Sequence, residues 1–321
     1  MLGAQAARDA YRVVPLKQPL KDSLAAKRQR MEAALSAYAS ASDSGVADVV
    51  TEAAYETAEL YHDLARALKQ SERPKNLDAE ARDQYDLLLD EQIDPFIDKA
   101  IALHEANIRR VTTGLYDPWI ARSYAALAAL APGRYAKADA SEPAVAPAAP
   151  GTSLPARAAQ AFQQAADAQR TQDWRAAEVR LQQLQRDYPE LPGAPVNLAI
   201  VYRLGGQGAA ARPLVEKAAK RWPGYAPAQH QLGLQLRDAG RFTDADAAYA
   251  RAIALDPGYA AAIYDRGVLN DLYLQRLDVA LAAYEQYQRL QAAPDAQVAR
   301  WIVDLRRRSG APSAAATGAS P

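Results

Sequence analysis

The chain has 321 residues, half of them apolar, and its 38 Lys and Arg balance its 38 Asp and Glu. A formal net charge of zero argues against a general nucleic-acid binder, which needs surplus cations to displace counterions. The absence of cysteine excludes disulfides, thiolate metal sites and a thiol nucleophile, and no apolar run is long enough to span a membrane.

The N-terminal half, residues 1–136, predicts a series of helices without a fixed repeat period. The predicted helices are Lys21–Ala39, Val46–Lys69, one that starts near Asp78, one that starts at Asp94-Pro95, and one that starts at Asp117-Pro118 and ends near Ala131. Asp followed by Pro is a helix-start signal, because Asp caps the free N–H groups and Pro has no N–H to lose. We expect these helices to pack as antiparallel pairs, in a divergent helical-repeat domain.

Residues 137–153 read KADASEPAVAPAAPGTS, a density of Ala, Pro, Ser and Gly that differs from both flanks. Such a composition cannot bury a core and is typical of an extended, semi-flexible linker. The sequence therefore predicts a linker that separates two domains.

The C-terminal half carries an internal repeat. Two independent series recur every 34 residues: Pro189, Pro223 and Pro257, and Ala177, Ala211 and Ala245. This is the period of the tetratricopeptide repeat (TPR), a pair of antiparallel helices. The sequence thus predicts an all-α fold, an α-solenoid forming a TPR superhelix, with four repeats and a capping helix over residues 154–308. Residues 309–321 are small and polar, and predict a disordered tail.

The clearest copy of the repeat runs from Ala226 to Tyr259. Gly233 and Ala252 stand where the two helices of a repeat cross, so we expect large side chains there to push the helices apart. Tyr249 fills the space between helices, and Pro257 ends the repeat because it cannot continue a helix.

The N-terminal half carries a second, more particular resemblance. The residues that carry it are Ser71-Glu72-Arg73-Pro74, Tyr85-Asp86-Leu87-Leu88-Leu89, Pro95-Phe96, Ala100-Ile101, His104-Glu105 and Pro132 through Tyr135. Over roughly residues 15–137 the chain resembles the end of large bacterial TPR proteins encoded beside TonB/ExbB/ExbD-type and gliding-motor envelope systems. The resemblance implies a periplasmic or envelope location, with an export signal upstream of Met1; otherwise the location is cytoplasmic.

No catalytic constellation is found in the sequence. His104-Glu105 begins a metalloprotease motif, but the second His that the motif needs is Ile108. Because His104 lies on an apolar stripe, we predict a buried core histidine. The sequence therefore predicts no catalytic residue, no cofactor and no metal site, and a non-enzymatic protein.

The concave face of a TPR superhelix is lined by the first helix of each repeat, so partner binding is expected there. Projecting the repeat register places the following residues in this groove: Phe162, Arg170, Asn197, Arg203, His230, Leu234, Arg237, Tyr264 and Asp265. The arginines suit carboxylates. Of the clamp with which chaperone-binding TPRs hold a terminal carboxylate only Asn197 is retained, so we predict another protein ligand, a peptide or a helix.

Three functions fit these features. The first is a protein-protein interaction scaffold in a bacterial envelope complex linked to a TonB/ExbBD-type or gliding-type energised machine. The second is a general TPR adaptor in secretion, polysaccharide export or pilus assembly, which needs only the repeats. The third is an enzyme carried on a helical scaffold, which the missing catalytic groups disfavour.

Overall fold

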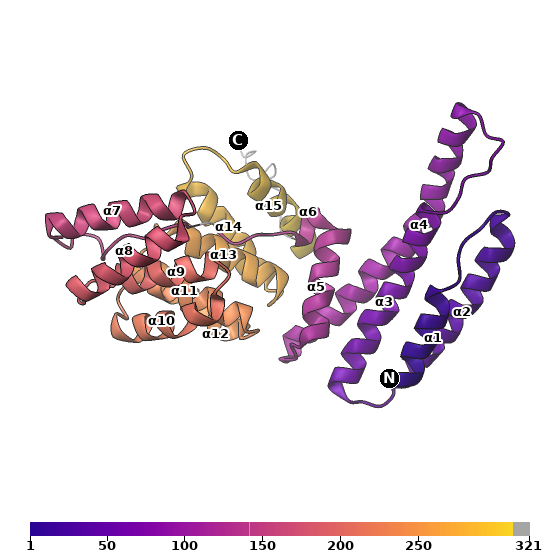
Figure 1. Ribbon diagram of the computed structural model, residues 1–321, viewed down its shortest axis with the longest axis horizontal. Coiled ribbons are helices and arrows are strands. Elements are labelled where there is room, and N and C mark those ends of the chain that lie inside the picture. Colours follow the sequence, from indigo (N-terminus) through magenta and orange to yellow (C-terminus); the bar gives the residue numbers. More distant parts are fainter. Residues whose placement is uncertain (141, 311–321) are drawn as a thin grey trace, which may run out of the picture. The chain divides into compact units, whose positions relative to one another are not determined.

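The computed structural model describes residues 1–140 and 142–310, and every regular element in these ranges is helical (Figure 1). The chain divides into two compact units, unit 1 (Met1–Lys137) and unit 2 (Ala138–Pro321). Among the described residues, no helix combines the length and apolarity needed to cross a bilayer.

Unit 1 is a series of helices in which each packs mainly on its neighbours in sequence. Its elements are α1 (Leu2–Arg12), α2 (Leu20–Ser42), α3 (Ala47–Lys69), α4 (Ala79–Ile108), the 3₁₀ turn η1 (Arg109–Thr113), α5 (Pro118–Leu130) and α6 (Pro132–Tyr135). Two predicted starts are confirmed: Asp78 and Asp117 each accept a hydrogen bond from a backbone N–H in the first turn of the helix that follows. Helix α1 is absent from the prediction.

The predicted helix start at Asp94-Pro95 is wrong, because α4 runs through Pro95 without a break. Leu89 and Ile93 before the proline, and Ile97 after it, belong to one apolar cluster with residues of α3. A proline inside a helix removes one hydrogen bond and crowds the preceding turn. Continuous burial along α3 offsets this cost.

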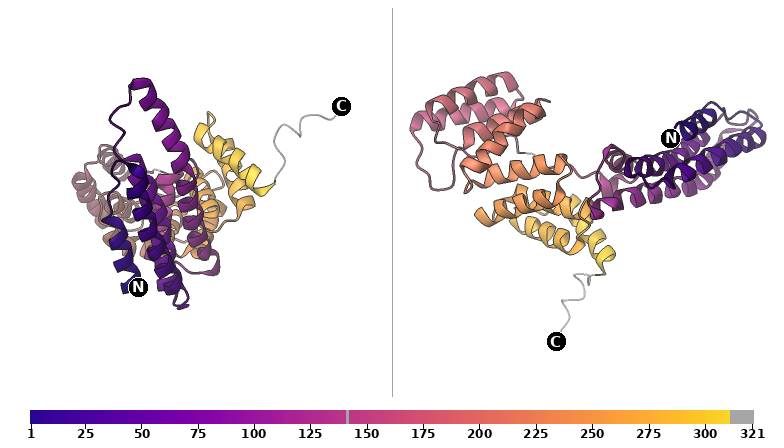
Figure 2. Two further views of the ribbon diagram at one scale, coloured as in Figure 1. Left: turned by 90° about the vertical axis from the view of Figure 1, so that its right-hand side faces the viewer. Right: turned by 90° about the horizontal axis from the view of Figure 1, so that it is seen from below.

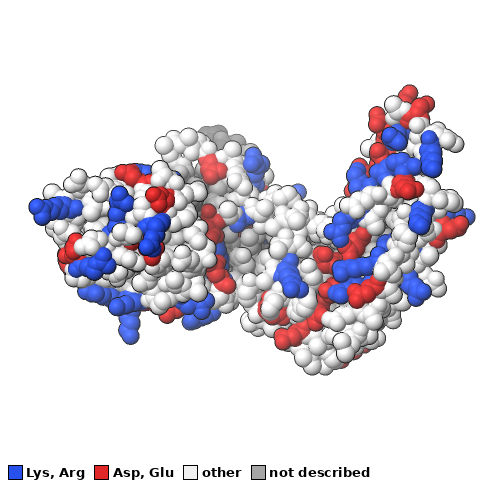
Figure 3. Space-filling view, viewed as in Figure 1, with Lys and Arg blue, Asp and Glu red and all other residues white. Residues whose placement is uncertain are grey.

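The surface of unit 1 mixes both signs of charge. Figure 3 shows Lys and Arg beside Asp and Glu over α1 to α4. Arg8 of α1 lies 2.7 Å from Glu56 of α3, and Arg12 lies 3.0 Å from Asp63 of the same helix. These pairs fix α1 against α3 in register, although partly exposed ion pairs each contribute little to stability.

In the part of unit 2 that the structure describes, four helix pairs are followed by one further helix (Figure 2). The pairs are α7 (Ala156–Arg170) with α8 (Trp174–Asp187), α9 (Gly193–Leu204) with α10 (Gly208–Arg221), α11 (Ala226–Asp238) with α12 (Phe242–Leu255), and α13 (Ala260–Leu272) with α14 (Leu277–Leu290). The last helix is α15 (Ala296–Ser309), whose first turn donates two backbone N–H groups to the side chain of Asp295. Residues 311–321, which include most of the predicted tail, lie outside the described residues.

The two helices of a pair approach each other at glycine. A Cβ on Gly233 would lie 2.4 Å from the ring of Tyr249, and one on Gly267 would lie 2.6 Å from the ring of Tyr284. Both tyrosines are fully buried. The expectation that Gly233 marks a helix crossing is therefore confirmed.

Candidate peptide-binding site

A coil segment of unit 2 lies along the first helix of every pair (Figure 1). It consists of Asp139, Ala140 and residues 142–147, and we call it the strap. The sequence predicts an extended, semi-flexible linker here. In the structure the strap is hydrogen-bonded along its length to α7, α9, α11 and α13. The composition correctly predicts that this segment forms no helix. It does not predict that the backbone groups of the segment form hydrogen bonds with the array.

An aspartate anchors the first end of the strap. Asp139 forms a two-pronged pair with the guanidinium of Arg237, in which Nη2 lies 2.9 Å from Oδ2. Arg203 lies further away, with Nη1 4.0 Å from the same oxygen. Burial would raise the pKa of Asp139, but the hydrogen bonds and charge of Arg237 outweigh it and hold that pKa below its ordinary value.

A buried histidine joins the strap to two helices. His230 Nε2 lies 2.7 Å from Asp265 Oδ2, and its Nδ1 lies 3.1 Å from Glu142 Oε2. The Tyr259 hydroxyl also donates to Glu142, and Asp265 accepts the N–H of Ala140 at 2.9 Å. Burial would lower the pKa of His230, but its hydrogen bonds with the two carboxylates raise the pKa to about 9. The imidazole is therefore positively charged at neutral pH and is shared between array and strap.

Amide side chains hold the middle of the strap by its backbone. Asn197 accepts the N–H of Val145 at 2.8 Å and donates to its carbonyl oxygen at 2.9 Å. Gln169 donates to the carbonyl oxygen of Pro143 at 2.7 Å. None of these contacts depends on which side chain the strap carries.

The last part of the strap lies directly on the backbone of α9. The N–H of Gly193 donates to the carbonyl oxygen of Pro147 at 2.9 Å, and the Tyr225 hydroxyl donates to that of Ala146. A Cβ at Gly193 would lie 2.5 Å from both Cα and the carbonyl oxygen of Pro147. Only glycine at this position permits the strap to lie so close.

Two hollows flank the strap. One, of about 280 Å³, lies between Val145 of the strap and Phe162 and Arg170 of α7. The other, of about 550 Å³, lies between strap residues and the segments around Tyr225 and Tyr259. The inner face thus retains open space beside the segment that already occupies it.

The predicted groove residues divide into three sets. The strap is contacted by Asn197, Arg203, His230, Arg237 and Asp265. Phe162 and Arg170 line the hollow beside it. Leu234 is fully buried, and Tyr264 packs against Tyr284, Tyr287 and Trp301.

Several residues of the site are missing from the prediction: Asp139, Glu142, Gly193, Tyr225 and Tyr259. The two acidic residues stand in a segment without periodicity, and only their charge, opposite to that of the predicted groove arginines, could have drawn attention to them. The role of Gly193 shows only in the structure, where the segment from Leu191 to Ile200 is buried and a strap backbone lies against the glycine.

Unit 1 holds a second buried histidine. His104 is fully buried as predicted, with Nδ1 3.3 Å from Ser123 Oγ and Nε2 3.3 Å from Glu59 Oε1. The hydroxyl of Ser123 also accepts a hydrogen bond from Asn107 at 3.0 Å and is itself buried. Because Ser123 is buried, it belongs to the core of unit 1. In the described part of the chain, no cluster of His, Asp or Glu is suited to a metal ion.

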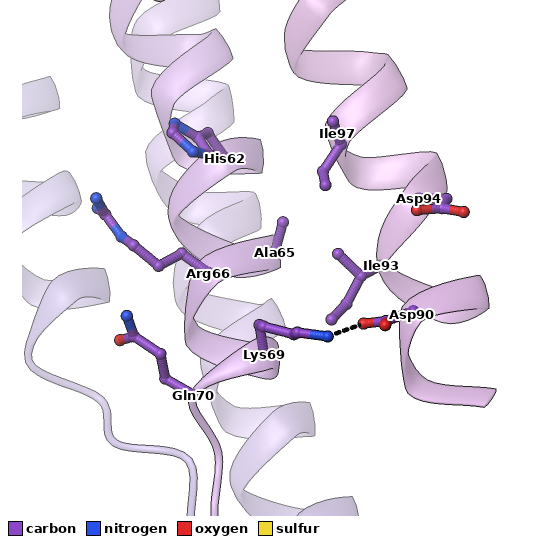
Figure 4. A pocket seen from close by; sticks show the side chains of 9 residues that line it. All are labelled: His62, Ala65, Arg66, Lys69, Gln70, Asp90, Ile93, Asp94 and Ile97. Carbon is purple, nitrogen blue, oxygen red and sulfur yellow. Dashed lines mark hydrogen bonds and ion pairs between the residues drawn. The ribbon is translucent and has the colours of Figure 1, made fainter. Parts of the chain in front are cut away.

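A hollow on the surface of unit 1 lies between α3 and α4 (Figure 4). Ala65, Ile93 and Ile97 form an apolar floor of this space of about 290 Å³. At its rim Lys69 pairs with Asp90. The charges of Lys69 and Asp90 therefore neutralise each other at this rim.

The repeat geometry decides the fold of unit 2: helix pairs of the 34-residue period, a glycine against a tyrosine at the crossings, and an inner face made by the first helices. Unit 2 has the TPR fold. No protein-family model matches the chain, and no curated protein matches it in sequence.

Solved structures similar to this chain are TPR-like but distant. A double mutant of MamA from RS-1 is 17% identical, with 49% of this chain and 87% of that chain covered and a TM-score of 0.40. YrrB, described as a TPR protein with an unusual peptide-binding site, is 17% identical over 77% of this chain and 92% of its own, with a TM-score of 0.35. Yeast Tom70 is 13% identical over 90% of this chain and 54% of its own, with a TM-score of 0.40.

Proposed function

We propose that this chain is a non-enzymatic protein-protein interaction scaffold, which uses the inner face of its TPR array to hold an extended peptide of a protein partner. The observation that carries the proposal is the pair of hydrogen bonds between Asn197 and both backbone groups of Val145. A side chain that pairs with the N–H and C=O of one residue binds an extended chain whatever its sequence. Arg237 and His230 add selectivity for carboxylates.

We further propose that the scaffold belongs to a bacterial envelope complex linked to a TonB/ExbBD-type or gliding-type energised machine, and that it faces the periplasm. The resemblance of roughly residues 15–137 to the end of large TPR proteins encoded beside such systems supports this setting. The alternative is a general TPR adaptor in secretion, polysaccharide export or pilus assembly. It is favoured by the array itself, whose peptide contacts all lie in unit 2.

The test is site-specific photo-crosslinking in the native host. A photoreactive residue replaces Arg170, which is exposed and lines the hollow beside the strap. The matched control places the same group at Val179 of α8, which is 49% exposed and lies outside that hollow. We expect protein adducts at Arg170 that are absent at Val179.

The identity of the adducts separates the two settings. Components of TonB/ExbB/ExbD-type or outer-membrane systems would support the envelope machine, whereas cytosolic proteins alone would exclude it and leave the general adaptor. Equal labelling at Arg170 and Val179 would contradict the use of the inner face as the partner surface.

A further inference from the structure

We infer that the strap is a built-in occupant of the partner site, and that the partner in trans presents an extended Ala- and Pro-rich peptide with two carboxylates spaced like Asp139 and Glu142. The inference rests on the proposed function, since it takes the inner face as the partner surface. It adds the chemistry of the ligand and a competition between that ligand and the strap.

The first argument is the kind of contact that the array makes. Six strap groups held by the array belong to the backbone: the N–H groups of Ala140 and Val145 and the carbonyl oxygens of Pro143, Val145, Ala146 and Pro147. Contacts of this kind accept any extended chain. Pro143 and Pro147 have no N–H to satisfy, which suits a peptide that pairs on a few fixed groups.

The second argument is charge complementarity at two positions. Among the described strap residues, Asp139 and Glu142 are held by polar side-chain contacts, the first by Arg237 and the second by His230 and Tyr259. The side chain of Val145 packs on an apolar cluster of the array. Carboxylates at these two positions therefore set the register of an otherwise sequence-tolerant peptide. A ligand with the pattern Asp-x-x-Glu-Pro, followed by small residues, fits these contacts.

The third argument is the polar lining beneath the strap. Gln169, Asn197, His230 and Asp265 are buried, and their side chains meet in hydrogen bonds with the strap or with each other. Burying such groups without partners is costly, whereas facing them with water or with a second peptide is not. The polar side chains of the inner face therefore keep hydrogen-bond partners when the strap leaves, provided that water or another chain replaces it.

The fourth argument is Gly193. Its missing side chain serves the close approach of Pro147, because the three atoms nearest to a Cβ at this position all belong to the strap residues Pro147 and Ala146. Gly208, the first residue of α10, the second helix of the same pair, has no neighbour within 4 Å of a Cβ. The chain thus contains a position where one methyl group blocks the site and a comparable helix-start position where it does not.

The experiment measures binding of a fluorescent peptide with the sequence of residues 137–150 to the full chain by fluorescence anisotropy. The tethered strap competes at a high effective concentration, so the unaltered chain should bind the peptide weakly. The double variant Asp139→Ala/Glu142→Ala weakens the strap and leaves the array unchanged. It should bind the peptide at least about tenfold more tightly. A peptide with Ala at both acidic positions should lose this affinity.

Two further variants locate the bound peptide. Adding Gly193→Ala to the double variant should abolish binding, and adding Gly208→Ala should leave it unchanged. Equal peptide affinity of the unaltered chain and the folded double variant, or tight binding despite Gly193→Ala, would overturn the inference. A dimer of the unaltered chain in which straps are exchanged would also overturn it, because the occupant would then be a second copy.

Native-state hydrogen exchange of the unaltered chain covers the case in which the double variant does not fold. The amides of Ala140 and Val145 should exchange through an opening that leaves the helices of the array protected. If they exchange only when the array unfolds, the strap is a permanent part of unit 2 and the inference is wrong. The crosslinking test at Arg170 remains informative in that case, so the two proposals fail separately.

Discussion

Two buried histidines show two kinds of interior in this molecule. His104 of unit 1 has its partners, Glu59 and Ser123, on the helices that pack around it. His230 of unit 2 has one carboxylate, Asp265, on the neighbouring repeat and the other, Glu142, on the strap. The hydrogen-bond network of His104 is complete once the helices of unit 1 have packed, whereas that of His230 also requires the strap, which lies outside the repeats. A polar network of the second kind can be opened without unfolding the array.

The carboxylate beside His104 also has all its partners within unit 1. Burial would raise the pKa of Glu59, but its hydrogen bonds with His104 and His62 lower it to about 2. All three groups belong to helices α3 and α4. Substitutions in unit 1 should therefore change stability alone, and substitutions beneath the strap should change strap docking.

The largest effect is expected from His104→Ala. The substitution leaves a cavity and removes a partner from buried Ser123, which together cost about 3 kcal/mol. Native-state hydrogen exchange should show lower protection of amides in α3, α4 and α5 and unchanged protection in unit 2. Leu88→Ala, at a side chain that is 54% exposed, is the control and should change protection little. A uniform loss over both units would contradict a network confined to unit 1.

A pH dependence is expected from His230, with an effect of similar size. The groups that face it are Asp265 of α13, Glu142 and Asp139 of the strap, Tyr259 and Tyr249. Its pKa is raised from 6.5 to about 9 in the folded chain, so the proton binds more tightly there than in the unfolded chain. The stabilisation is complete below pH 6.5 and is lost as the pH rises through about 9, by on the order of 3 kcal/mol.

Urea unfolding of the chain and of His230→Gln, each at pH 6 and pH 9.5, measures this difference. Groups other than His230 titrate in both proteins and cancel in the comparison. The chain should lose more stability than the variant between the two pH values. Parallel loss in both would show that His230 does not carry a shifted proton.

A smaller loss of stability is expected from Gly193→Ala in the otherwise unaltered chain. The new methyl group cannot coexist with Pro147, but the strap can move away, so the cost is limited to the docking of the strap, about 1–2 kcal/mol. Exchange of the Ala140 and Val145 amides should become fast while helix α9 stays protected. Gly208→Ala should leave both unchanged. Loss of protection throughout α9 would mean that the strap is needed for the repeat to fold.

How far the sequence predicts this structure depends on the range of the interactions. Gly233 and the cap Asp117 follow from patterns within one repeat or one helix turn, and these predictions hold. Arg203 and Arg237 follow from projecting one repeat onto the next, because the TPR geometry repeats with the sequence.

The remainder depends on contacts between distant segments. Arg237 pairs with Asp139 across 98 positions, and nothing periodic links a repeat to a Pro- and Ala-rich segment. The helix break predicted at Pro95 is wrong for a related reason, since the apolar contacts of α4 with α3 outweigh a local signal. Local chemistry thus predicts the array and its lining, while the occupant of the groove required the structure.

The smallest loss of stability is expected from Arg203→Ala, and it distinguishes Arg203 from Arg237, which the repeat pattern places at equivalent positions. Arg237 makes two hydrogen bonds with Asp139, whereas Arg203 approaches it only to 4.0 Å. Arg203→Ala should therefore cost less than about 1 kcal/mol of strap docking, as expected for a partly exposed, poorly aligned pair. Arg237→Ala should cost more, because it leaves a largely buried carboxylate unpaired. Protection of the Ala140 amide measures both, and equal effects would show that charge near Asp139, rather than the two-pronged geometry, holds this end of the strap.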